Sequence, residues 1–343
     1  MEFKNNMKYF WICFFILIKS AEVKHMFVPE DESLSDTIES TSEKDVEVKV
    51  HNGTRHAFFR DMDVGATPGG AGSRRVFGGT SSELKEFPTV SALLDRYLTV
   101  RCTATILNKH WVLTAAHCVT PRLAYVKYNT RRPASNEGSI SAIHYLYRHP
   151  NYKVKQEDIG RGLDVQILHH DVGLVRTKEE IKLPALKLGF SGWRRNNALD
   201  LYNKDIKVFG FGRTERSVLG EELFSVDLTL VPCEQSDWLY CVCGVAKSDS
   251  PRGVCSGDSG GPILYNGEPV GVTSMGPTVC AHGGETPPVG STSVFTSLYQ
   301  YSDIINATIE DTETAMRMRI ISQATIFSPY QVLFTVSLIL PAR

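Results

Sequence analysis

The stretch Gly-Asp-Ser-Gly-Gly-Pro at residues 257–262 is the most informative part of this sequence. Its glycines allow a tight turn in which backbone N–H groups converge beside the exposed hydroxyl of Ser259. A carbonyl group held there is open to attack by that hydroxyl. The N–H groups of Gly257 and Ser259 can stabilise the oxyanion that develops. The stretch therefore predicts a nucleophilic serine, provided that a base and an orienting acid lie elsewhere in the chain.

Two further motifs supply these partners. Residues 111–118 read Trp-Val-Leu-Thr-Ala-Ala-His-Cys and contain His117, while residues 170–175 read His-Asp-Val-Gly-Leu-Val and contain Asp171. A neutral His117 can take the proton of Ser259 near pH 7, and Asp171 can fix the tautomer of the imidazole. The order His, Asp, Ser is that of chymotrypsin, and it differs from the orders of subtilisin and of the α/β-hydrolases.

With these three motifs, residues 76–310 resemble a serine endopeptidase of the trypsin/chymotrypsin type. The resemblance implies an all-β fold of two six-stranded antiparallel barrels, with the active site in the cleft between them and a C-terminal helix. Short runs of β-branched residues separated by Gly, Pro and Asn turns are typical of such a fold. The resemblance also implies a catalytic triad of His117, Asp171 and Ser259 and an oxyanion hole formed by Gly257 and Ser259.

A second resemblance to this family lies upstream. Residues 72–79 read Gly-Ser-Arg-Arg-Val-Phe-Gly-Gly, like the activation site of the family's zymogens. Cleavage after Arg75 would free the α-amino group of Val76, and motif position makes Asp258 the carboxylate with which it pairs. A buried carboxylate without a partner is costly, so an ion pair that only cleavage supplies is a workable switch. Phe77 departs from the smaller aliphatic residue usual in the family, and an ordinary basic surface loop is the alternative.

The resemblance further positions the pocket for the substrate side chain. Its base falls on Gly253, six residues before Ser259, where an aspartate would select Arg and Lys. Its walls fall on Ser274, Gly276 and Ser293. Such an open and uncharged pocket favours an apolar residue before the cleaved bond, as in chymotrypsin or elastase.

Two residues complicate this interpretation. Met275 stands where the family has a tryptophan, and Glu285 lies in a long loop from which it would restore a preference for Arg and Lys if it reached the pocket. Trypsin-like specificity is therefore one alternative. A non-catalytic adaptor with a protease fold is another, although such proteins usually lack a member of the triad. His169 and His170 have no second cluster with zinc-ligand spacing, so neither a metal nor a cofactor is expected.

The two ends of the chain are expected to lie outside the protease domain. Residues 1–20 are interpreted as a signal peptide, because lysines precede an apolar core at 9–18. Residues 21–75 are predicted to form a largely disordered propeptide. Residues 311–343 form a C-terminal extension with an apolar end. This extension loosely resembles a GPI-attachment signal, and a segment packed on the enzyme or a weak membrane contact are the alternatives.

Secretion would permit disulfides. One of the eight cysteines, Cys13, lies in the signal peptide, which leaves seven, so one thiol is left over. The pairs that the resemblance implies are Cys102 with Cys118, Cys255 with Cys280, and Cys233 with either Cys241 or Cys243. Asn52 and Asn306 begin glycosylation sequons.

The composition is that of an ordinary globular protein. The chain has 343 residues, of which 22% are charged, and a net charge of −1. This balance, with no cluster of basic residues and interleaved aromatics, argues against nucleic-acid binding. The expected partners are protein or peptide substrates, an upstream protease that cuts after Arg75, and protease inhibitors. The small number of cysteines resembles that of secreted invertebrate members of the family.

Overall fold

The computed structural model describes the larger part of the chain. The described residues are 56–57, 78–158, 163–183, 192–212, 222–247, 251–277, 280, 287–311 and 317–323. They all fall in the unit Asn52–Arg343. The proposed signal peptide, Arg75, Val76, Glu285 and the apolar end of the tail lie outside them. No helix within the described ranges is long and apolar enough to cross a membrane.

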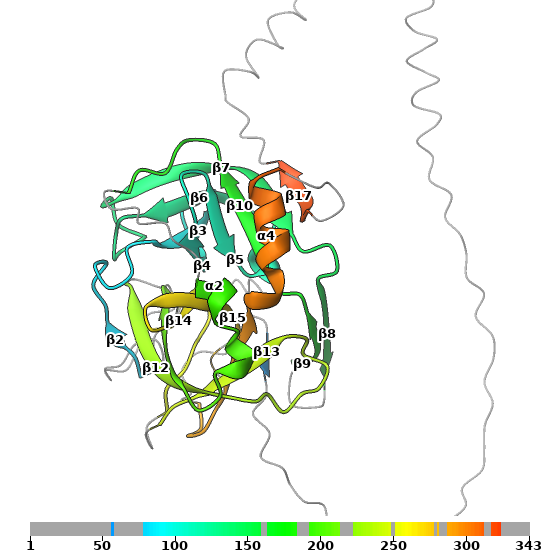
Figure 1. Cartoon of the computed structure of the whole chain (residues 1–343). Helices are drawn as coiled ribbons and strands as arrows, with labels where there is room; N and C mark the ends of the chain where they lie inside the picture. The colour runs from blue at the N-terminus through cyan, green and yellow to red at the C-terminus, as the bar shows by residue number, and fades with distance from the viewer. Residues whose placement is uncertain are drawn as a thin grey trace, which may run out of the picture. The chain divides into compact units, whose positions relative to one another are not determined.

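Six antiparallel strands form the first barrel (Figure 1). They are β3 (Val90–Asp95), β4 (Val100–Ile106), β5 (Trp111–Thr114), β6 (Leu123–Tyr128), β7 (Ser139–Arg148) and β10 (Gly173–Thr177). The order is β10-β5-β4-β3-β6-β7, and β10 pairs with β7 to close the barrel. Its interior is filled by aliphatic side chains such as Ile106, Val126 and Leu146, all of which are fully buried.

A second set of six antiparallel strands forms the other barrel. They are β11 (Asp205–Gly210), β12 (Phe224–Val231), β13 (Cys241–Val245), β14 (Pro262–Tyr265), β15 (Glu268–Pro277) and β16 (Ser293–Ser297). The order is β14-β11-β12-β13-β16, and β15 pairs with both β14 and β16 to close the ring. In β12 the apolar residues Phe224, Val226, Leu228 and Leu230 alternate with more polar ones and are buried, as a strand with one inward face requires. The predicted all-β fold of two six-stranded barrels is confirmed.

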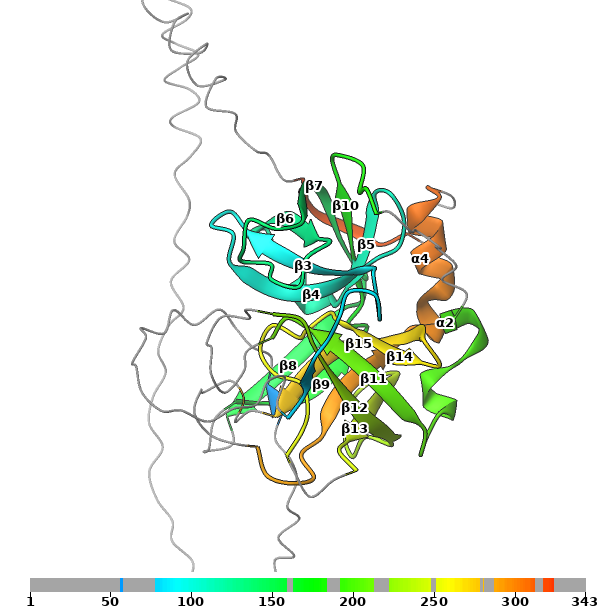
Figure 2. The same ribbon diagram turned by 90° about the vertical axis from the view of Figure 1, so that its left-hand side faces the viewer.

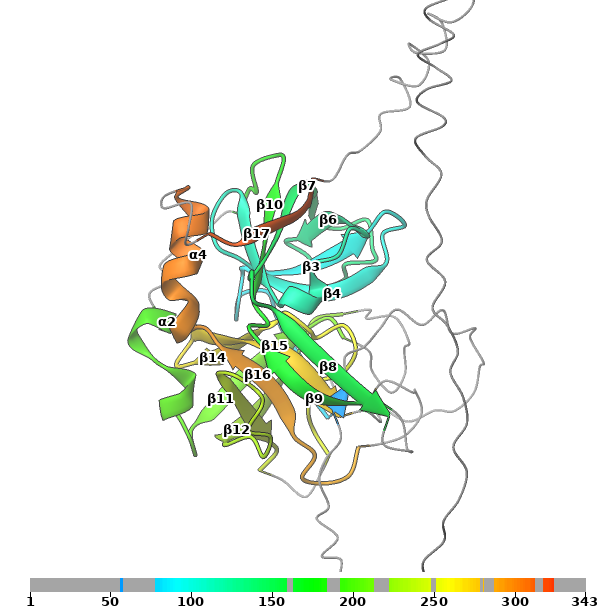
Figure 3. The same ribbon diagram turned by 90° about the vertical axis from the view of Figure 1, so that its right-hand side faces the viewer.

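The remaining elements are short. They comprise β1 (His56–Ala57), β2 (Thr80–Ser81), β8 (Lys153–Asp158), β9 (Leu163–His169), β17 (Arg319–Gln323), the helices α2 (Gly192–Arg195) and α4 (Ser302–Ile309), and 3-10 turns at Ala116–Cys118, Ala198–Asp200 and Tyr299–Tyr301. Strands β8 and β9 form a separate hairpin, and β17 pairs with β7. Helix α4 is the predicted C-terminal helix, and Figures 2 and 3 show it beside the barrels. Its Ile305 packs in one cluster with Trp111 and Leu174 of the first barrel.

Candidate active site

His117 and Asp171 lie at adjacent ends of two paired strands. His117 follows β5 and Asp171 precedes β10, and the register sets Gly173 opposite Thr114. Asp171 Oδ2 is 2.9 Å from His117 Nδ1, and the backbone N–H of His117 donates to Oδ1 at 2.9 Å. Asp171 is fully buried. When Nδ1 carries the proton that faces this carboxylate, Nε2 is left as the acceptor, which is the form that a general base needs.

The turn around Ser259 is fixed against the first barrel. The Thr103 N–H donates to the Ser259 carbonyl at 2.9 Å, and the Gly260 N–H donates to the Thr273 carbonyl at 2.7 Å. Gly260 has φ +78°, and a Cβ added there would overlap Thr114 Oγ1. The nucleophile turn therefore lies directly against the strand that ends three residues before His117. Ser259 is only 3% exposed, so most of the residue for which the motif predicted an exposed hydroxyl is buried in the turn.

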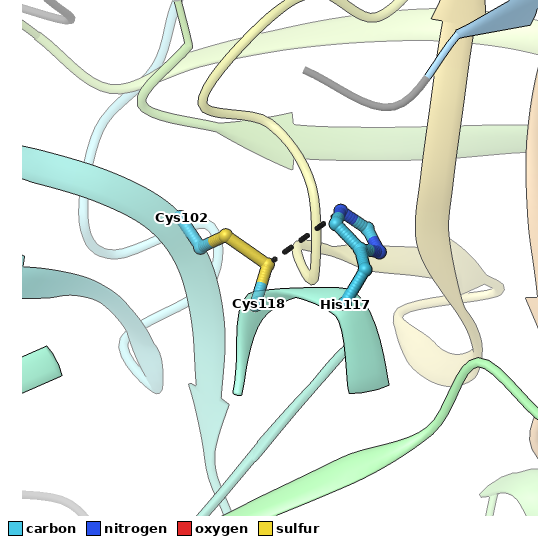
Figure 4. Close-up of side chains that lie close together, drawn as sticks. All are labelled: Cys102, His117 and Cys118. Carbon is cyan, nitrogen blue, oxygen red and sulfur yellow. Dashed lines mark hydrogen bonds between the residues drawn. A yellow bond between two sulfur atoms is a disulfide. The ribbon is translucent and has the colours of Figure 1, made fainter. Parts of the chain in front are cut away.

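A disulfide joins β4 to the turn that contains His117. Cys102 precedes Thr103, which binds the serine turn, and Cys118 follows His117; the two cysteines are bonded to each other. Figure 4 shows the imidazole of His117 beside this disulfide, with Nε2 3.8 Å from Cys118 Sγ. Cys102, His117 and Cys118 are also the one group of three potential metal ligands among the described residues. Both sulfurs are used in the disulfide, so neither is a thiolate that could bind a metal.

Gly257 and Asp258 complete the turn. Gly257 has φ +96°, which favours glycine, and its carbonyl accepts a hydrogen bond from Thr103 Oγ1 at 2.8 Å. The N–H of Asp258 donates to the Cys255 carbonyl at 3.0 Å. The structure thus places Gly257 and Ser259 in one turn that lies against Thr114 and Ala115, the residues shortly before His117.

The carboxylate of Asp258 is buried with few partners. It accepts hydrogen bonds from the N–H groups of Gly212 and Cys255, each at 2.8 Å. Gly210 and Gly212 leave the space that it fills, since a Cβ on either would overlap the carboxyl group. No basic side chain among the described residues pairs with it. Burial raises the pKa of Asp258 to about 7, against the lowering effect of the two hydrogen bonds.

The four residues assigned to the substrate pocket lie close together. The Val254 N–H donates to Ser293 Oγ at 3.0 Å, and a Cβ on Gly253 would lie 2.9 Å from that same oxygen. A Cβ on Gly276 would overlap the Val254 carbonyl, so β15 and the loop that contains Val254 approach closely only because Gly276 has no side chain. Ser274 Oγ lies 2.7 Å from Thr296 Oγ1. Cys255, next to Val254, is bonded to Cys280.

The hairpin β8–β9 is an element that the sequence reasoning missed. Val165 and Leu168 of β9 pack with Trp238 and with Met275, which is fully buried. The Trp238 indole N–H donates to the Val165 carbonyl at 3.2 Å. The alternation of apolar and polar residues in 163–169 was the available signal. Met275, which replaces the family's tryptophan, is therefore covered by this hairpin.

A cluster of aromatic rings lies behind Asp171. His170 stacks on His149 with ring centroids 4.2 Å apart, and its Nδ1 lies 3.3 Å from the Tyr301 hydroxyl. Burial and the neighbouring His170 lower the pKa of His149 to about 4. The pKa of His170 is also lowered by burial and by His169. Both imidazoles are therefore neutral near pH 7 and add no positive charge beside Asp171.

The third disulfide joins Cys233 to Cys243. This leaves Cys241 as a free and buried thiol. Burial raises the pKa of that thiol well above its usual range. A thiol held protonated in this way is a poor nucleophile, so it is not a second reactive centre.

Comparison with known proteins agrees with this arrangement. The family model described as Trypsin matches residues 76–305. Venom serine protease 34 of Apis mellifera is 30% identical over 207 residues, which are 56% of this chain and 48% of that protein. CLIP domain-containing serine protease B4 of Anopheles gambiae is 25% identical over 277 residues, 68% of this chain and 70% of that protein. Glandular kallikrein of Sus scrofa is 26% identical over 258 residues, 69% of this chain and 97% of that protein.

The chain thus spans about half the length of the honeybee protein and nearly all of the porcine one. The match to the family model covers both barrels and the motifs that contain His117, Asp171 and Ser259. The chain belongs to the trypsin family of serine proteases.

Proposed function

We propose that this chain is a secreted serine endopeptidase, made as a zymogen, that hydrolyses peptide bonds through Ser259, His117 and Asp171. The observation that supports the proposal is the hydrogen-bonded pair of His117 and Asp171, at the end of the strand whose Thr114 lies against Gly260 of the serine turn. Ser259 Oγ would attack the carbonyl carbon while His117 Nε2 takes its proton. The N–H groups of Gly257 and Ser259 would hold the oxyanion, and removal of one such donor typically costs about 10²–10³ in rate.

The tetrahedral intermediate then collapses to an acyl-enzyme. His117 gives its proton to the leaving amine, which departs as the first product. A water molecule, deprotonated by His117, attacks the acyl carbon and frees the acid product and Ser259. Throughout these steps Asp171 stays ionised and stabilises the imidazolium form of His117.

Activation is proposed to follow cleavage after Arg75, which frees the α-amino group of Val76. Asp258 supports this step, because it is a buried carboxylate with no basic partner among the described residues and with a pKa of about 7. Gly78, two residues after Val76, already lies against the Pro251 carbonyl, since a Cβ added to it would be 2.6 Å from that oxygen. An α-ammonium group delivered to Asp258 would offset the desolvation cost of the carboxylate.

The proposed preference is for an apolar residue before the cleaved bond. Gly253 brings no charge to the base of the pocket, and Ser274, Gly276 and Ser293 around it are small and neutral. A cleavage profile of the Arg75-cleaved enzyme on a peptide library tests this preference. Strong cleavage after Arg or Lys would contradict it and would favour trypsin-like specificity.

Secretion is proposed from the N-terminal apolar segment, together with three disulfides of the kind that oxidising compartments permit. Protein or peptide substrates, an activating protease that cuts after Arg75 and protease inhibitors are the proposed partners. Attachment to a membrane through the C-terminal tail stays an open alternative. Expression with and without residues 1–20, followed by assay of the culture medium, tests secretion.

The decisive experiment is active-site labelling. The precursor is cleaved after Arg75 and treated with a fluorophosphonate probe, with Ser259→Ala as the matched control. We expect one label per molecule on Ser259 after cleavage and none on the control. Arg75→Gln should leave the precursor uncut and weakly labelled. A fully cleaved, folded protein that takes up no label would contradict the assignment of a catalytic serine.

A further inference from the structure

Strand β1 lies in the predicted propeptide, yet it pairs with β15 of the second barrel. His56 lies opposite Pro277 and Ala57 opposite Gly276, in antiparallel register. Figures 2 and 3 show this short blue strand beside the second barrel. The pairing of β14 with β15 ends at Val272, so the last residues of β15 are left for β1. Since Gly276 is one of the proposed pocket residues, the propeptide occupies the strand that lines the proposed pocket.

The hairpin β8–β9 gives this strand a second neighbour, because β1 also lies near β9. The hairpin is tied to the second barrel, since the Leu239 N–H donates to the Leu168 carbonyl at 2.8 Å and Val165 packs with Met275. A strand end flanked by such a fixed hairpin suits an extended peptide, which is recognised through its main chain and gains specificity from alternate side chains.

We propose that β1 is an autoinhibitory strand that occupies the substrate-binding edge of β15 in the precursor. This inference rests on the proposed function for the identity of the pocket. The propeptide has no cysteine, so no disulfide retains it after cleavage. Activation therefore needs two steps, cleavage after Arg75 and release of this strand, and the free segment inhibits the cleaved enzyme.

The first test adds a synthetic peptide of residues 52–60 to the Arg75-cleaved enzyme during hydrolysis of a small chromogenic substrate. We expect competitive inhibition, with KM raised and kcat unchanged. Ala57→Pro in the peptide removes a main-chain N–H and should weaken inhibition by ~10-fold or more. His56→Ala, which keeps the main chain, should not weaken inhibition. Absence of inhibition, or equal inhibition by the Ala57→Pro peptide, would overturn the inference.

The second test needs no activity. Hydrogen exchange is measured on the precursor carrying Ser259→Ala, alone and with Ala57→Pro or His56→Ala added. The amides of residues 273–277 should be protected in the parent and in His56→Ala, and should exchange ~10-fold faster in Ala57→Pro. Unchanged exchange in Ala57→Pro would overturn the inference even if the cleaved enzyme is labelled at Ser259. Failure of that labelling would count against the proposed function alone, because the exchange result does not depend on it.

Discussion

Asp258 holds its carboxylate away from water with two backbone N–H groups as its partners among the described residues. Its pKa is raised from 3.8 to about 7, so the folded precursor binds more protons than the unfolded chain between these values. The resulting stability is present at acidic pH and is lost as pH rises through 7. In the inactive Ser259→Ala background, we expect the free energy of unfolding to fall by roughly 1–3 kcal/mol between pH 5 and pH 8.

Asp258→Asn should remove this fall, as measured by urea denaturation at the two pH values. Asp95 offers a matched control, because it is also buried but pairs with Arg101 at 2.7 Å. Burial, which raises its pKa, is outweighed by hydrogen bonds from Thr99, Arg101 and Tyr97, so that its pKa is lowered. Asp95→Asn should therefore leave the slope between pH 5 and pH 8 unchanged. An equal slope in the parent and in Asp258→Asn would contradict the account of activation given above.

His149 should have the opposite effect on the pH dependence of stability, and this effect belongs to acidic pH. Its pKa is lowered from 6.5 to about 4 by burial and by His170, so the unfolded chain binds more protons between these values. The precursor should therefore lose stability as pH falls from 7 to 4, by about 1–3 kcal/mol from this residue. His149→Gln should reduce the loss, which thermal melts at pH 7 and pH 4.5 would measure. A variant that melts with the same pH dependence as the parent would exclude His149 as the cause.

At the same scale, the proposed catalytic residues could be named from the sequence because each lies in a local motif whose spacing reflects a turn or a strand end. The burial of Met275 against the hairpin β8–β9 and the identity of the free cysteine were not predictable. Cys241 and Cys243 are two residues apart in β13, so they face the same side of the strand and either could point toward Cys233. Only the register of β13 against its neighbours decides between them, and the sequence around Cys233 carries no signal for that register.

At the scale of elements, the hairpin β8–β9 packs on Trp238, which lies between β12 and β13. Trp238 packs on Val165 and Leu168, and its indole N–H binds the Val165 carbonyl. Trp238→Ala should cost about 3–5 kcal/mol, since it leaves a large cavity. Trp238→Phe keeps most of the apolar contact and should cost less, though it also loses the hydrogen bond, worth about 0.5–1.5 kcal/mol.

Hydrogen exchange of residues 163–169 separates local from global effects in this pair of variants. We expect Trp238→Phe to raise exchange in β9 while exchange in β4 and β12 stays as in the parent. A uniform rise in all three strands would show that the hairpin unfolds only with the whole protein. The hairpin escaped prediction because its alternating residues also suit a strand of the first barrel, and the partner that buries them lies 73 residues away.

At the scale of the whole molecule, the two barrels were predictable from the family resemblance, while the pairings of the chain ends were not. Strands β1 and β17 each add to a barrel strand that is already paired elsewhere along its length. Such additions depend on an edge left free by distant parts of the chain, and they consist of few residues. No local pattern in residues 56–57 or 319–323 distinguishes them from a loop, so only the assembled barrels reveal where they bind.

The tail strand leads to a prediction about truncation. Ile320 of β17 lies opposite Tyr147 of β7, and Met318 is buried in the cluster that contains α4. The Met318 N–H also donates to Thr308 Oγ1 at 2.9 Å.

A chain that ends after Asp311 loses all three contacts of the tail. The lost burial of Met318, together with one hydrogen bond, should lower the free energy of unfolding by about 2–4 kcal/mol. A chain that ends after Gln323 keeps them and should unfold at the same urea concentration as the 343-residue chain. Because the proposed catalytic residues lie elsewhere, both chains should take up the fluorophosphonate label after cleavage at Arg75. Equal stability of the two chains would mean that β17 contributes no net stability to the barrel.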